Sequence, residues 1–363
     1  MIVQNDTDKL EIIGLMSGTS LDGLDIAHVS FEFKNQKVHF ELLNCETTPY
    51  DSEILLQLQK YKDLSIPEIL ILDKKIGRYY GEKVNEFIAK NKLVKNHIDA
   101  IACHGQTIYH QPQNGFTYQI GCGSTLAYLT RIKVINDFRT RDIIAGGQGA
   151  PLVPIGDFDL FANQAESFLN IGGFANISFK KGNDIIAFDI CPGNLPLNLL
   201  ANQLGLDYDK NGELAKSGRI ISKLLKQLNA LEFYCLDPPK SLGTEWLEKD
   251  FYHFLQGKHE TKDLMRTIVE HIAIQISSVL KNENLSSVLI SGGGAKNTFL
   301  INRINANFEG KIILPENKII DFKEAIIFAY LGALYLKGNS TTLTSVTGAE
   351  RPVCSGVLHI PGY

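Results

Sequence analysis

The segment that decides the fold runs from Ile12 to Asp25 and reads IIGLMSGTSLDGLD. It begins as an apolar run, breaks into small and acidic residues, and is followed by a second apolar run, IAHV, at residues 26–29. Glycine permits positive φ angles and a close approach of the backbone to a neighbouring group. The pattern predicts two strands, at residues 11–16 and 24–33, joined by a loop that brings its backbone close to a bound group.

Length and composition are those of an ordinary globular enzyme or binding protein. The chain has 363 residues, more than a single core usually supports, so two domains are expected. A net charge of −4, without long runs of Lys or Arg, argues against nucleic-acid binding. The six cysteines lack C-x-x-C spacing, which favours reduced thiols. No apolar run reaches about 18 residues and residues 1–10 lack a signal-peptide core, so we expect a cytoplasmic protein that does not contact membranes.

Strands alternate with helices along the chain, which predicts an α/β fold. In the first half we expect further strands at residues 37–45 and 98–107, a strand that runs into a loop over 133–142, and helices at 52–60, 66–90 and 124–131. In the second half we expect helices at 194–204, 216–230, 261–282, 295–308 and 321–338, and strands at 286–294 and 311–315. A Gly/Pro cluster, AGGQGAPLVP at residues 145–154, interrupts regular structure, and we place a domain junction near it.

The order of elements at the N-terminus returns after residue 167. Residues 167–190, SFLNIGGFANISFKKGNDIIAFDI, predict a strand, a Gly-Gly turn, a strand, a polar turn and a third strand. Gly14 and Gly172 lie 158 residues apart. The identity between the two segments is weak, so the repeat rests on pattern alone. Two halves of like topology, each with a glycine-bearing hairpin tip, predict two lobes that face one cleft.

Three glycine-bearing segments follow predicted strands and are candidates for phosphate binding. In the first, Ser17, Thr19 and Ser20 add hydroxyl groups to backbone N–H groups that can form an anion nest, but the lysine of a Walker A loop is absent. The second is NIGGFANIS at residues 170–178. The third is LISGGGAKN at residues 289–297, where a strand leads through glycines into a helix start. An Asp-Gly hairpin, a tight turn and a bare strand-to-helix turn are the respective alternatives.

Two carboxylates lie at the ends of predicted elements. Asp189 follows a buried strand in AFDICPGN (187–194), where it can act as a general base or cap the following helix. Glu324 opens the last long helix. A favourable interaction with the helix dipole is sufficient to explain it, and a ligand contact is possible.

Two further polar clusters lie near predicted strand ends. His104 and Gln106, in CHGQTIYH (103–110), can hydrogen-bond a polyhydroxy ligand, or the histidine can simply be packed. Asp137 and Arg139 belong to NDFRTRD (136–142). An arginine there can clamp a carboxylate or phosphate, and an exposed ion pair is the alternative.

Taken together, these segments resemble the anhydro-N-acetylmuramic acid kinase family. The matching strings, in chain order, are GLMSGTSLDGLD, HGQTIYHQP, TYQIG, DFRTRDIIAGGQGAPLVP, NIGGFANIS, FDICPGN, PPKSLGTEW, SGGGAKN and VTGAERP. They extend from residue 14 to residue 352. The resemblance implies the actin-like ATPase fold, a two-lobed α/β fold with a central cleft. We expect residues 1–135 with about 340–363 in the first lobe and residues 136–339 in the second.

The resemblance also implies a reaction. ATP, accompanied by Mg²⁺, phosphorylates O6 of 1,6-anhydro-N-acetylmuramic acid from cell-wall turnover while water opens the anhydro bridge at C1. The products are N-acetylmuramic acid 6-phosphate and ADP. Asp189 is implied to be the base that acts on water, and a homodimer is implied as well. From the residues alone, a non-catalytic ATP-dependent binding or filament-forming protein of this fold, and a kinase of an ordinary hexose, stay open.

The residues implied to bind ligands fall into two groups. Those expected at the nucleotide are Gly18, Thr19, Ser20, Leu21, Asp22, Gly23, Leu24, Asp25, Gly172, Gly173, Gly292, Gly293 and Gly294. Those expected at the sugar are His104, Gln106, Asp137, Arg139 and Glu324. An arginine suits the lactyl carboxylate that distinguishes muramic acid from glucosamine. The chain departs from the usual FDTGPGN at Ile190 and Cys191, and has Thr244 where arginine is frequent.

Overall fold

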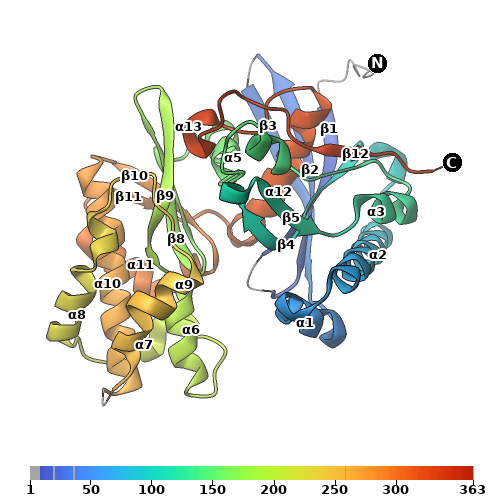
Figure 1. Ribbon diagram of the computed structural model, residues 1–363. Coiled ribbons are helices and arrows are strands. Elements are labelled where there is room, and N and C mark those ends of the chain that lie inside the picture. The colour runs from blue at the N-terminus through green and yellow to red at the C-terminus, as the bar shows by residue number, and fades with distance from the viewer. Residues whose placement is uncertain (1–8, 19–20, 36, 258, 363) are drawn as a thin grey trace. The chain divides into compact units, whose positions relative to one another are not determined.

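The computed structural model describes residues 9–18, 21–35, 37–257 and 259–362. The chain divides into two compact units (Figure 1). Unit 1 comprises Met1–Phe161 and Phe322–Tyr363, and unit 2 comprises Ala162–Asp321. Unit 2 is therefore an insertion into unit 1, and both ends of the chain belong to unit 1.

Unit 1 is built on a mixed sheet. Its strands are β1 (Lys9–Ser17), β2 (Leu24–Lys34), β3 (Lys37–Thr48), β4 (Ala100–Gln111), β5 (Phe116–Ile120), β6 (Val134–Asn136) and β12 (Val357–His359). They are ordered β12-β6-β4-β1-β2-β3, and β5 pairs with β4. β1 and β2 are antiparallel and remain paired as far as Met16 and Asp25, whereas β1 and β4 are parallel. The parallel pairing brings the ends of β1 and β4 to the same edge of the sheet.

Most helices of unit 1 contribute apolar residues to its core. The helices are α1 (Ser52–Gln59), α2 (Ile66–Lys90), α3 (Gly123–Thr130), α4 (Thr140–Ile144), α5 (Val153–Leu160), α12 (Asn317–Leu336), which begins in unit 2, and α13 (Thr344–Thr347). In α2, Leu72, Ile76, Tyr80 and Val84 recur at the helical period and are buried. Glu68 accepts a hydrogen bond from the Ser65 N–H at 2.7 Å, which completes the capping box that starts this helix.

Unit 2 contains a second mixed sheet with its own core. Its strands are β7 (Ser167–Ile171), β8 (Phe174–Lys181), β9 (Asp184–Pro192), β10 (Ser287–Ser291) and β11 (Lys311–Ile313), in the order β11-β10-β7-β8-β9. Its helices are α6 (Asn194–Asn202), α7 (Glu213–Ser217), α8 (Ser222–Asn229), α9 (Thr244–Trp246), α10 (Thr261–Asn282) and α11 (Thr298–Asn307). The long helix α10 contributes Met265, Ile268, Ile272 and Ile276 to this core.

The two sheets share one arrangement of strands. β1 lies between a parallel neighbour, β4, and an antiparallel neighbour, β2, which pairs in turn with β3. β7 likewise lies between parallel β10 and antiparallel β8, which pairs with β9. The α/β class and the repeated topology expected from the sequence are therefore confirmed, and they agree with the actin-like fold. Gly14, however, lies inside β1, where an added Cβ would be 1.9 Å from the Ala325 carbonyl oxygen of α12.

Several element boundaries differ from the expectation. Within 133–142 the expected strand ends at Asn136, where Asp137 adopts a left-handed φ of +55°, but the short helix α4 follows in place of an irregular loop. The helix expected at 216–230 is divided at Gly218 into α7 and α8. The residues 136–161 and 322–339, which we expected in the second lobe, lie in unit 1, where Phe138 and Phe328 pack with ring centroids 5.8 Å apart. Among the described helices, none combines the length and the apolarity needed to cross a membrane.

Candidate functional site

The glycine-bearing turn between β1 and β2 combines a buried residue with an exposed carboxylate. Leu24 is fully buried, whereas Asp22 is exposed at the tip of the turn. Gly23 has a φ of +154°, and an added Cβ would lie 2.6 Å from the Thr48 carbonyl oxygen, so a larger residue does not fit. Asp25 accepts a hydrogen bond from the Thr47 hydroxyl at 2.5 Å. Leu24 therefore serves the core, and Asp22 is the carboxylate of this turn that faces solvent.

The beginning of this turn is also defined. The Leu21 N–H donates to the Gly18 carbonyl at 3.3 Å, and Leu21 itself adopts a φ of +57°. Thr19 and Ser20, two of the residues expected at the nucleotide, lie outside the described residues.

A buried chain of hydroxyl groups connects β1 to Gln106. The Ser17 hydroxyl donates to Gln106 Oε1 and lies 2.6 Å from the Tyr50 hydroxyl, which is 2.9 Å from the Tyr80 hydroxyl. Burial raises the pKa of Tyr50 to about 12, so both tyrosines stay neutral and act as hydrogen-bonding groups. Gln106 is thereby held in one orientation, with its Nε2 donating to the Thr107 carbonyl at 3.4 Å.

His104 and Arg139 form a direct hydrogen-bonded pair. The Nε and Nη2 groups of Arg139 donate to His104 Nε2 at 3.2 and 2.9 Å, and Nη1 donates to the Gly149 carbonyl at 2.7 Å. Burial, and then the charge of Arg139, hold the pKa of His104 well below its usual value. The imidazole is therefore neutral, and its proton lies on Nδ1 because Nε2 accepts. The pair is partly buried, whereas the alternative expected for the segment NDFRTRD was an exposed ion pair.

Glu324, in the first part of α12, shares the electrostatic environment of this pair. Burial raises the pKa of Glu324, while Lys323 and Arg139 oppose the rise. Burial likewise lowers the pKa of Arg139 to about 10, and the charges of Glu324 and Asp142 oppose that shift. The expectation that Glu324 opens the last long helix is wrong, because α12 begins at Asn317, about two turns earlier, where the dipole effect is concentrated. Its surroundings are instead marked by burial and by the charges of Lys323 and Arg139.

Asp137 directly follows β6, and its side chain hydrogen-bonds to the backbone of its own segment. Its Oδ1 accepts a hydrogen bond from the Thr140 N–H at 3.3 Å, which fixes the entry into α4. The structure therefore pairs His104 with Arg139 and places Glu324 close enough for its charge to affect the pKa of Arg139. Gln106 lies on the same strand as His104, and Asp137 lies two residues before Arg139.

In unit 2, Asp189 lies in β9 and is half-buried. Its Oδ2 accepts a hydrogen bond from the Leu242 N–H at 2.8 Å, and its own N–H donates to the Lys240 carbonyl at 3.1 Å. Burial raises the pKa of Asp189, and the Leu242 N–H partly opposes the rise. No side chain caps α6, which follows Gly193, so the helix-cap alternative for Asp189 is wrong. The carboxylate is instead held at the segment 237–246.

The Gly172–Gly173 turn at the end of β7 presents carbonyl groups to a helix start. The Gly173 carbonyl accepts from the Gly193 N–H at 2.8 Å, and the Gly172 carbonyl accepts from the Asn194 N–H at 2.8 Å. An added Cβ at Gly193 would lie 2.4 Å from the Gly172 oxygen. These bonds occupy the first N–H groups of α6, so the turn supports that helix, and its role at a nucleotide stays a prediction.

The Gly292–Gly294 turn follows β10 and packs closely on the end of β7. An added Cβ would lie 2.4 Å from Asn170 Oδ1 at Gly292 and 2.3 Å from Ile171 Cγ2 at Gly294, whereas Gly293 is exposed and meets only Asn194 Nδ2, at 3.5 Å. A 3₁₀ turn covers Gly293–Lys296, so the helix expected from residue 295 begins only at Thr298. Of the three glycines, Gly293 is the one with open space beside it.

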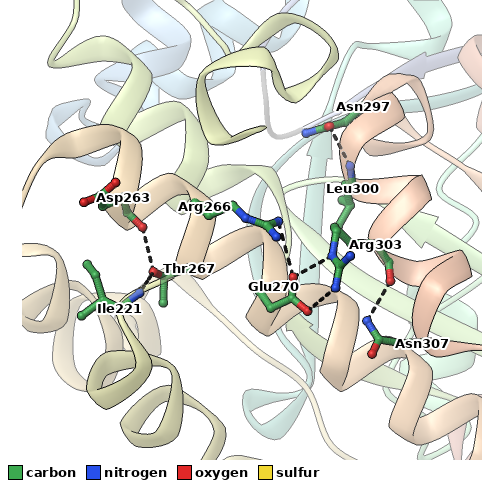
Figure 2. Close-up of polar contacts among 9 residues, drawn as sticks. All are labelled: Ile221, Asp263, Arg266, Thr267, Glu270, Asn297, Leu300, Arg303 and Asn307. Carbon is green, nitrogen blue, oxygen red and sulfur yellow. Dashed lines mark hydrogen bonds and ion pairs between the residues drawn. The ribbon is translucent and has the colours of Figure 1, made fainter. Parts of the chain in front are cut away.

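Helix α11, which follows this turn, is capped and anchored by side chains. Asn297 Oδ1 accepts from the Leu300 N–H at 3.0 Å, so a side chain already caps this helix N-terminus. Arg303 donates through Nε and Nη2 to the Glu270 carboxylate of α10 at 2.7 and 2.8 Å (Figure 2). Arg266 Nη1 lies 3.4 Å from the same carboxylate. Burial raises the pKa of Glu270, but the bonds from Arg303 more than offset it, so the carboxylate stays ionised.

Several residues of these surroundings were not identified from the sequence as site residues. Asp142 and the ion pair of Lys323 with Asp157, at 2.7 Å, are buried. Tyr50 likewise joins the Ser17–Gln106 group from a loop that follows β3. Each of them has a partner far away in the chain: Ser17 lies 33 residues from Tyr50, Asp157 lies 166 residues from Lys323, and Asp142 lies 205 residues from Thr347. No local pattern identifies such partners. The one available signal was that Asp142 lies inside a matching string, DFRTRDIIAGGQGAPLVP; Asp157 lies three residues beyond its end.

Comparison with known proteins decides the family. The family model described as anhydro-N-acetylmuramic acid kinase matches residues 10–361. The chain belongs to the anhydro-N-acetylmuramic acid kinase family. Proteins named anhydro-N-acetylmuramic acid kinase from Francisella tularensis subsp. novicida and Coxiella burnetii are each 37% identical to it. The alignments cover 96% and 97% of this chain and 98% of each relative. A relative of the same name from Mannheimia succiniciproducens is 36% identical, over 96% of this chain and 99% of its own.

Membership of the anhydro-N-acetylmuramic acid kinase family extends over both units. The match begins in β1, which contains the apolar run before the first glycine-bearing turn, and ends after β12. The resemblance stated from the strings is therefore confirmed at the level of the family, and Asp189 lies within the matched residues.

Proposed function

We propose that this chain is an ATP-dependent kinase of 1,6-anhydro-N-acetylmuramic acid. It transfers phosphate to O6 while water opens the anhydro bridge, and it releases N-acetylmuramic acid 6-phosphate and ADP in the recycling of cell-wall peptidoglycan. The observation that carries the proposal is the family match over residues 10–361. The half-buried Asp189 carboxylate, held by one backbone N–H, supports the assignment of a base.

The chemistry of the substrate explains why the base acts on water. O6 of the anhydro sugar is an acetal oxygen and carries no proton that a base could remove. Asp189 takes a proton from water as the water oxygen bonds to C1. The C1–O6 bond breaks, and its electron pair lets O6 bond to the γ-phosphorus as ADP leaves. This resembles an inverting glycosidase in which the γ-phosphate takes the place of the general acid.

The environment of Asp189 suits this role. Burial raises its pKa, which makes the carboxylate a stronger base than an exposed aspartate, and the Leu242 N–H keeps it oriented. Cys191 is buried and its thiol pKa is raised by burial, so it is assigned a packing role instead of a nucleophilic one.

Sugar binding is assigned to the residues around Arg139. Arg139 uses three of its five N–H groups for His104 and Gly149, which leaves two, counted over the described residues, for the lactyl carboxylate. Glu324 can accept hydrogen bonds from sugar hydroxyls, and Gln106 and Asp137 are assigned as further contacts. A neutral His104 is consistent with this assignment, because it positions the guanidinium without adding a second positive charge.

Nucleotide binding is assigned to the glycine-bearing segments at residues 18–25, 172–173 and 292–294. Among the residues that the structure describes, no cluster of three or more His, Cys, Asp or Glu side chains is arranged to hold a metal ion. The exposed Asp22 carboxylate is nevertheless an oxygen donor of the kind that Mg²⁺ prefers, so Mg²⁺ brought by ATP fits there. Bound Mg²⁺ would offset charge on the phosphates. We further propose that the protein is a cytoplasmic homodimer.

Incubation with Mg-ATP and the anhydro sugar in ¹⁸O-labelled water tests the proposal. We expect one ¹⁸O at C1 and none in the phosphate ester, together with one ADP for each sugar phosphorylated. An ordinary hexose in place of the anhydro sugar is the control, and we expect no phosphorylation of it. ADP release without a sugar product, or label absent from C1, would reject the proposed reaction.

A further inference from the structure

Asp142, in α4, is fully buried and takes part in two hydrogen bonds from distant segments. Its Oδ2 accepts from the Gly149 N–H at 2.8 Å, and its Oδ1 accepts from the Thr347 hydroxyl of α13 at 2.8 Å. Its backbone carbonyl accepts from the Gly147 N–H at 2.9 Å. One aspartate therefore joins both ends of one matching string, DFRTRDIIAGGQGAPLVP, to a second string, VTGAERP, far along the chain.

The loop at residues 147–149 is shaped around this carboxylate. An added Cβ at Gly147 would lie 2.2 Å from Asp142 Oδ2, so only glycine lets the loop approach so closely. Gly149 adopts a φ of +65°. The Gln148 N–H donates to the Thr347 carbonyl at 2.8 Å, which ties the loop to α13 a second time.

The opposite side of Gly149 faces Arg139. Its N–H is held by Asp142, and its carbonyl accepts from Arg139 Nη1 at 2.7 Å. The negative charge of Asp142 also favours the guanidinium cation against burial. Because His104 fixes the other edge of the same guanidinium, the direction of Arg139 depends on where Gly149 is held.

We propose that Asp142 is a positioning residue for sugar binding, which sets the direction of Arg139 through the Gly149 peptide and depends on Thr347 to do so. The inference rests on the proposed function, since it takes Arg139 as a contact of the sugar. A carboxylate suits the role because it accepts from both donors. Asparagine has one side-chain oxygen where aspartate has two. With that oxygen towards the Gly149 N–H, its amide N–H group faces Thr347 Oγ1, so the hydroxyl loses the carboxylate acceptor and can donate only to the Leu343 carbonyl at 3.3 Å.

The test compares variants by steady-state kinetics and by direct binding of the anhydro sugar. We expect Asp142→Asn to raise the KM for the sugar roughly tenfold or more, with the KM for ATP within about twofold of wild type. Thr347→Val removes one of the two donors and should give a smaller rise in the sugar KM. Thr347→Ser keeps the hydroxyl and should restore binding.

The matched control is Asp209→Asn in unit 2. Asp209 is also buried, and it accepts from the Leu214 and Ala215 N–H groups at 2.9 Å each. That variant should lose thermal stability as Asp142→Asn does, yet keep the wild-type KM for the sugar, which separates positioning from general destabilisation.

The outcomes are distinct. A wild-type chain that neither binds nor phosphorylates the sugar rejects the proposed function, and this inference with it. A wild-type chain that is active, with Asp142→Asn and Thr347→Val unchanged in sugar KM, overturns the inference alone. If Asp142→Asn fails to fold, the inference is tested by comparing Thr347→Val with Thr347→Ser. Equal sugar KM values in these two variants would count against a positioning role for Asp142.

Discussion

At Asp189, the protonation state that favours folding differs from the one that the proposed reaction needs. Its pKa lies above the ordinary 3.8 because burial disfavours the ionised form. For such an acid the folded state binds more protons than the unfolded state, so stability falls as pH rises through the raised pKa. The ionised carboxylate that the proposed reaction needs is therefore the form that the fold tolerates less well.

Replacing Asp189 with Asn should separate the two effects. We expect Asp189→Asn to lower kcat by roughly 10²–10⁴-fold, because the base is lost while its shape is kept. We also expect a slightly higher Tm than wild type at neutral pH, with the difference shrinking as pH falls through the carboxyl pKa. Differential scanning calorimetry between pH 4 and pH 8, with a coupled ADP assay, measures both.

In the wild type, kcat/KM should decline on the acid side at a higher pH than an ordinary carboxyl would give. Normal turnover in Asp189→Asn would show that the base is another residue. A lower Tm for the variant at neutral pH would show that the ionised carboxylate stabilises the fold.

At this scale candidate site residues could be named from the sequence, and their roles stay predictions, but their partners in the fold could not be named. Asp189, His104 and Arg139 belong to family strings and were named from them. The N–H group that holds Asp189 belongs to Leu242, 53 residues away, and the hydroxyl that donates to Asp142 belongs to Thr347, 205 residues away. Such partners are set by tertiary packing, which strand and helix periodicity does not encode.

At the scale of elements, the three glycines of the turn after β10 differ in how much space a larger side chain would have, so alanine substitutions there should differ in their effect on stability. We expect Gly292→Ala and Gly294→Ala to lower the free energy of unfolding by about 2–4 kcal/mol, because each added Cβ meets atoms within 2.4 Å and Gly292 also has a φ of +79°. Gly293→Ala should cost less than about 1 kcal/mol, since the space beside it is open.

Urea unfolding of the three variants compares these costs. If Gly293 contacts the nucleotide as proposed, Gly293→Ala should raise the KM for ATP in spite of its wild-type stability. Equal destabilisation by all three substitutions would show that the turn is not packed as described.

The buried ion pair between Asp157 of α5 and Lys323 of α12 allows a second prediction, about the cost of leaving one of its charges without a partner. Lys323→Met leaves the Asp157 carboxylate buried without its ammonium partner, and we expect a loss of about 3–5 kcal/mol in the free energy of unfolding. The double variant Lys323→Met/Asp157→Leu should recover much of that loss, because no uncompensated charge remains. A double-mutant cycle by urea unfolding measures the coupling, and additive losses would contradict it.

Element types could be predicted from the sequence better than their ends. The paired strands β1 to β3 and β7 to β9 were expected from alternating apolar residues and Gly or polar turns. A strand that runs into a loop was expected over 133–142, but the short helix α4 was not, since NDFRTRD gives no sign that Asp137 adopts a left-handed φ and that a helix follows. The start of α11 was placed three residues early, because three glycines followed by alanine fit a 3₁₀ turn as well as a helix.

At the scale of the whole molecule, unit 2 is a contiguous segment with its own core. The residues of that core all lie between Leu169 and Ile320. We expect residues 162–321, expressed alone, to fold with a cooperative thermal transition and a circular dichroism spectrum of mixed helix and strand. Residues 1–161 alone lack α12 and β12 and provide the contrast, for which we expect no cooperative transition. A non-cooperative melt of residues 162–321 would show that its core needs unit 1.

The presence of two units could be predicted from length and from the repeated strand pattern. Their limits fell elsewhere, at Phe161 and Phe322 instead of near residues 135 and 340. The Gly/Pro cluster at 145–154 predicts a junction because it interrupts regular structure. It packs inside unit 1 because Asp142 and Thr347 hold it there, through bonds that only the folded chain brings together.

The insertion of unit 2 into unit 1 has a consequence for how the protein is made. A ribosome delivers residues at roughly 5–20 per second, so α12 and β12 emerge on the order of ten seconds or more after Phe161. Throughout that interval β6 has no β12 beside it, and the face of β1 at Gly14 is bare of α12. Apolar surface of the nascent N-terminal segment therefore stays exposed until the C-terminal part of the chain has been translated. That interval is when chaperone binding would protect it.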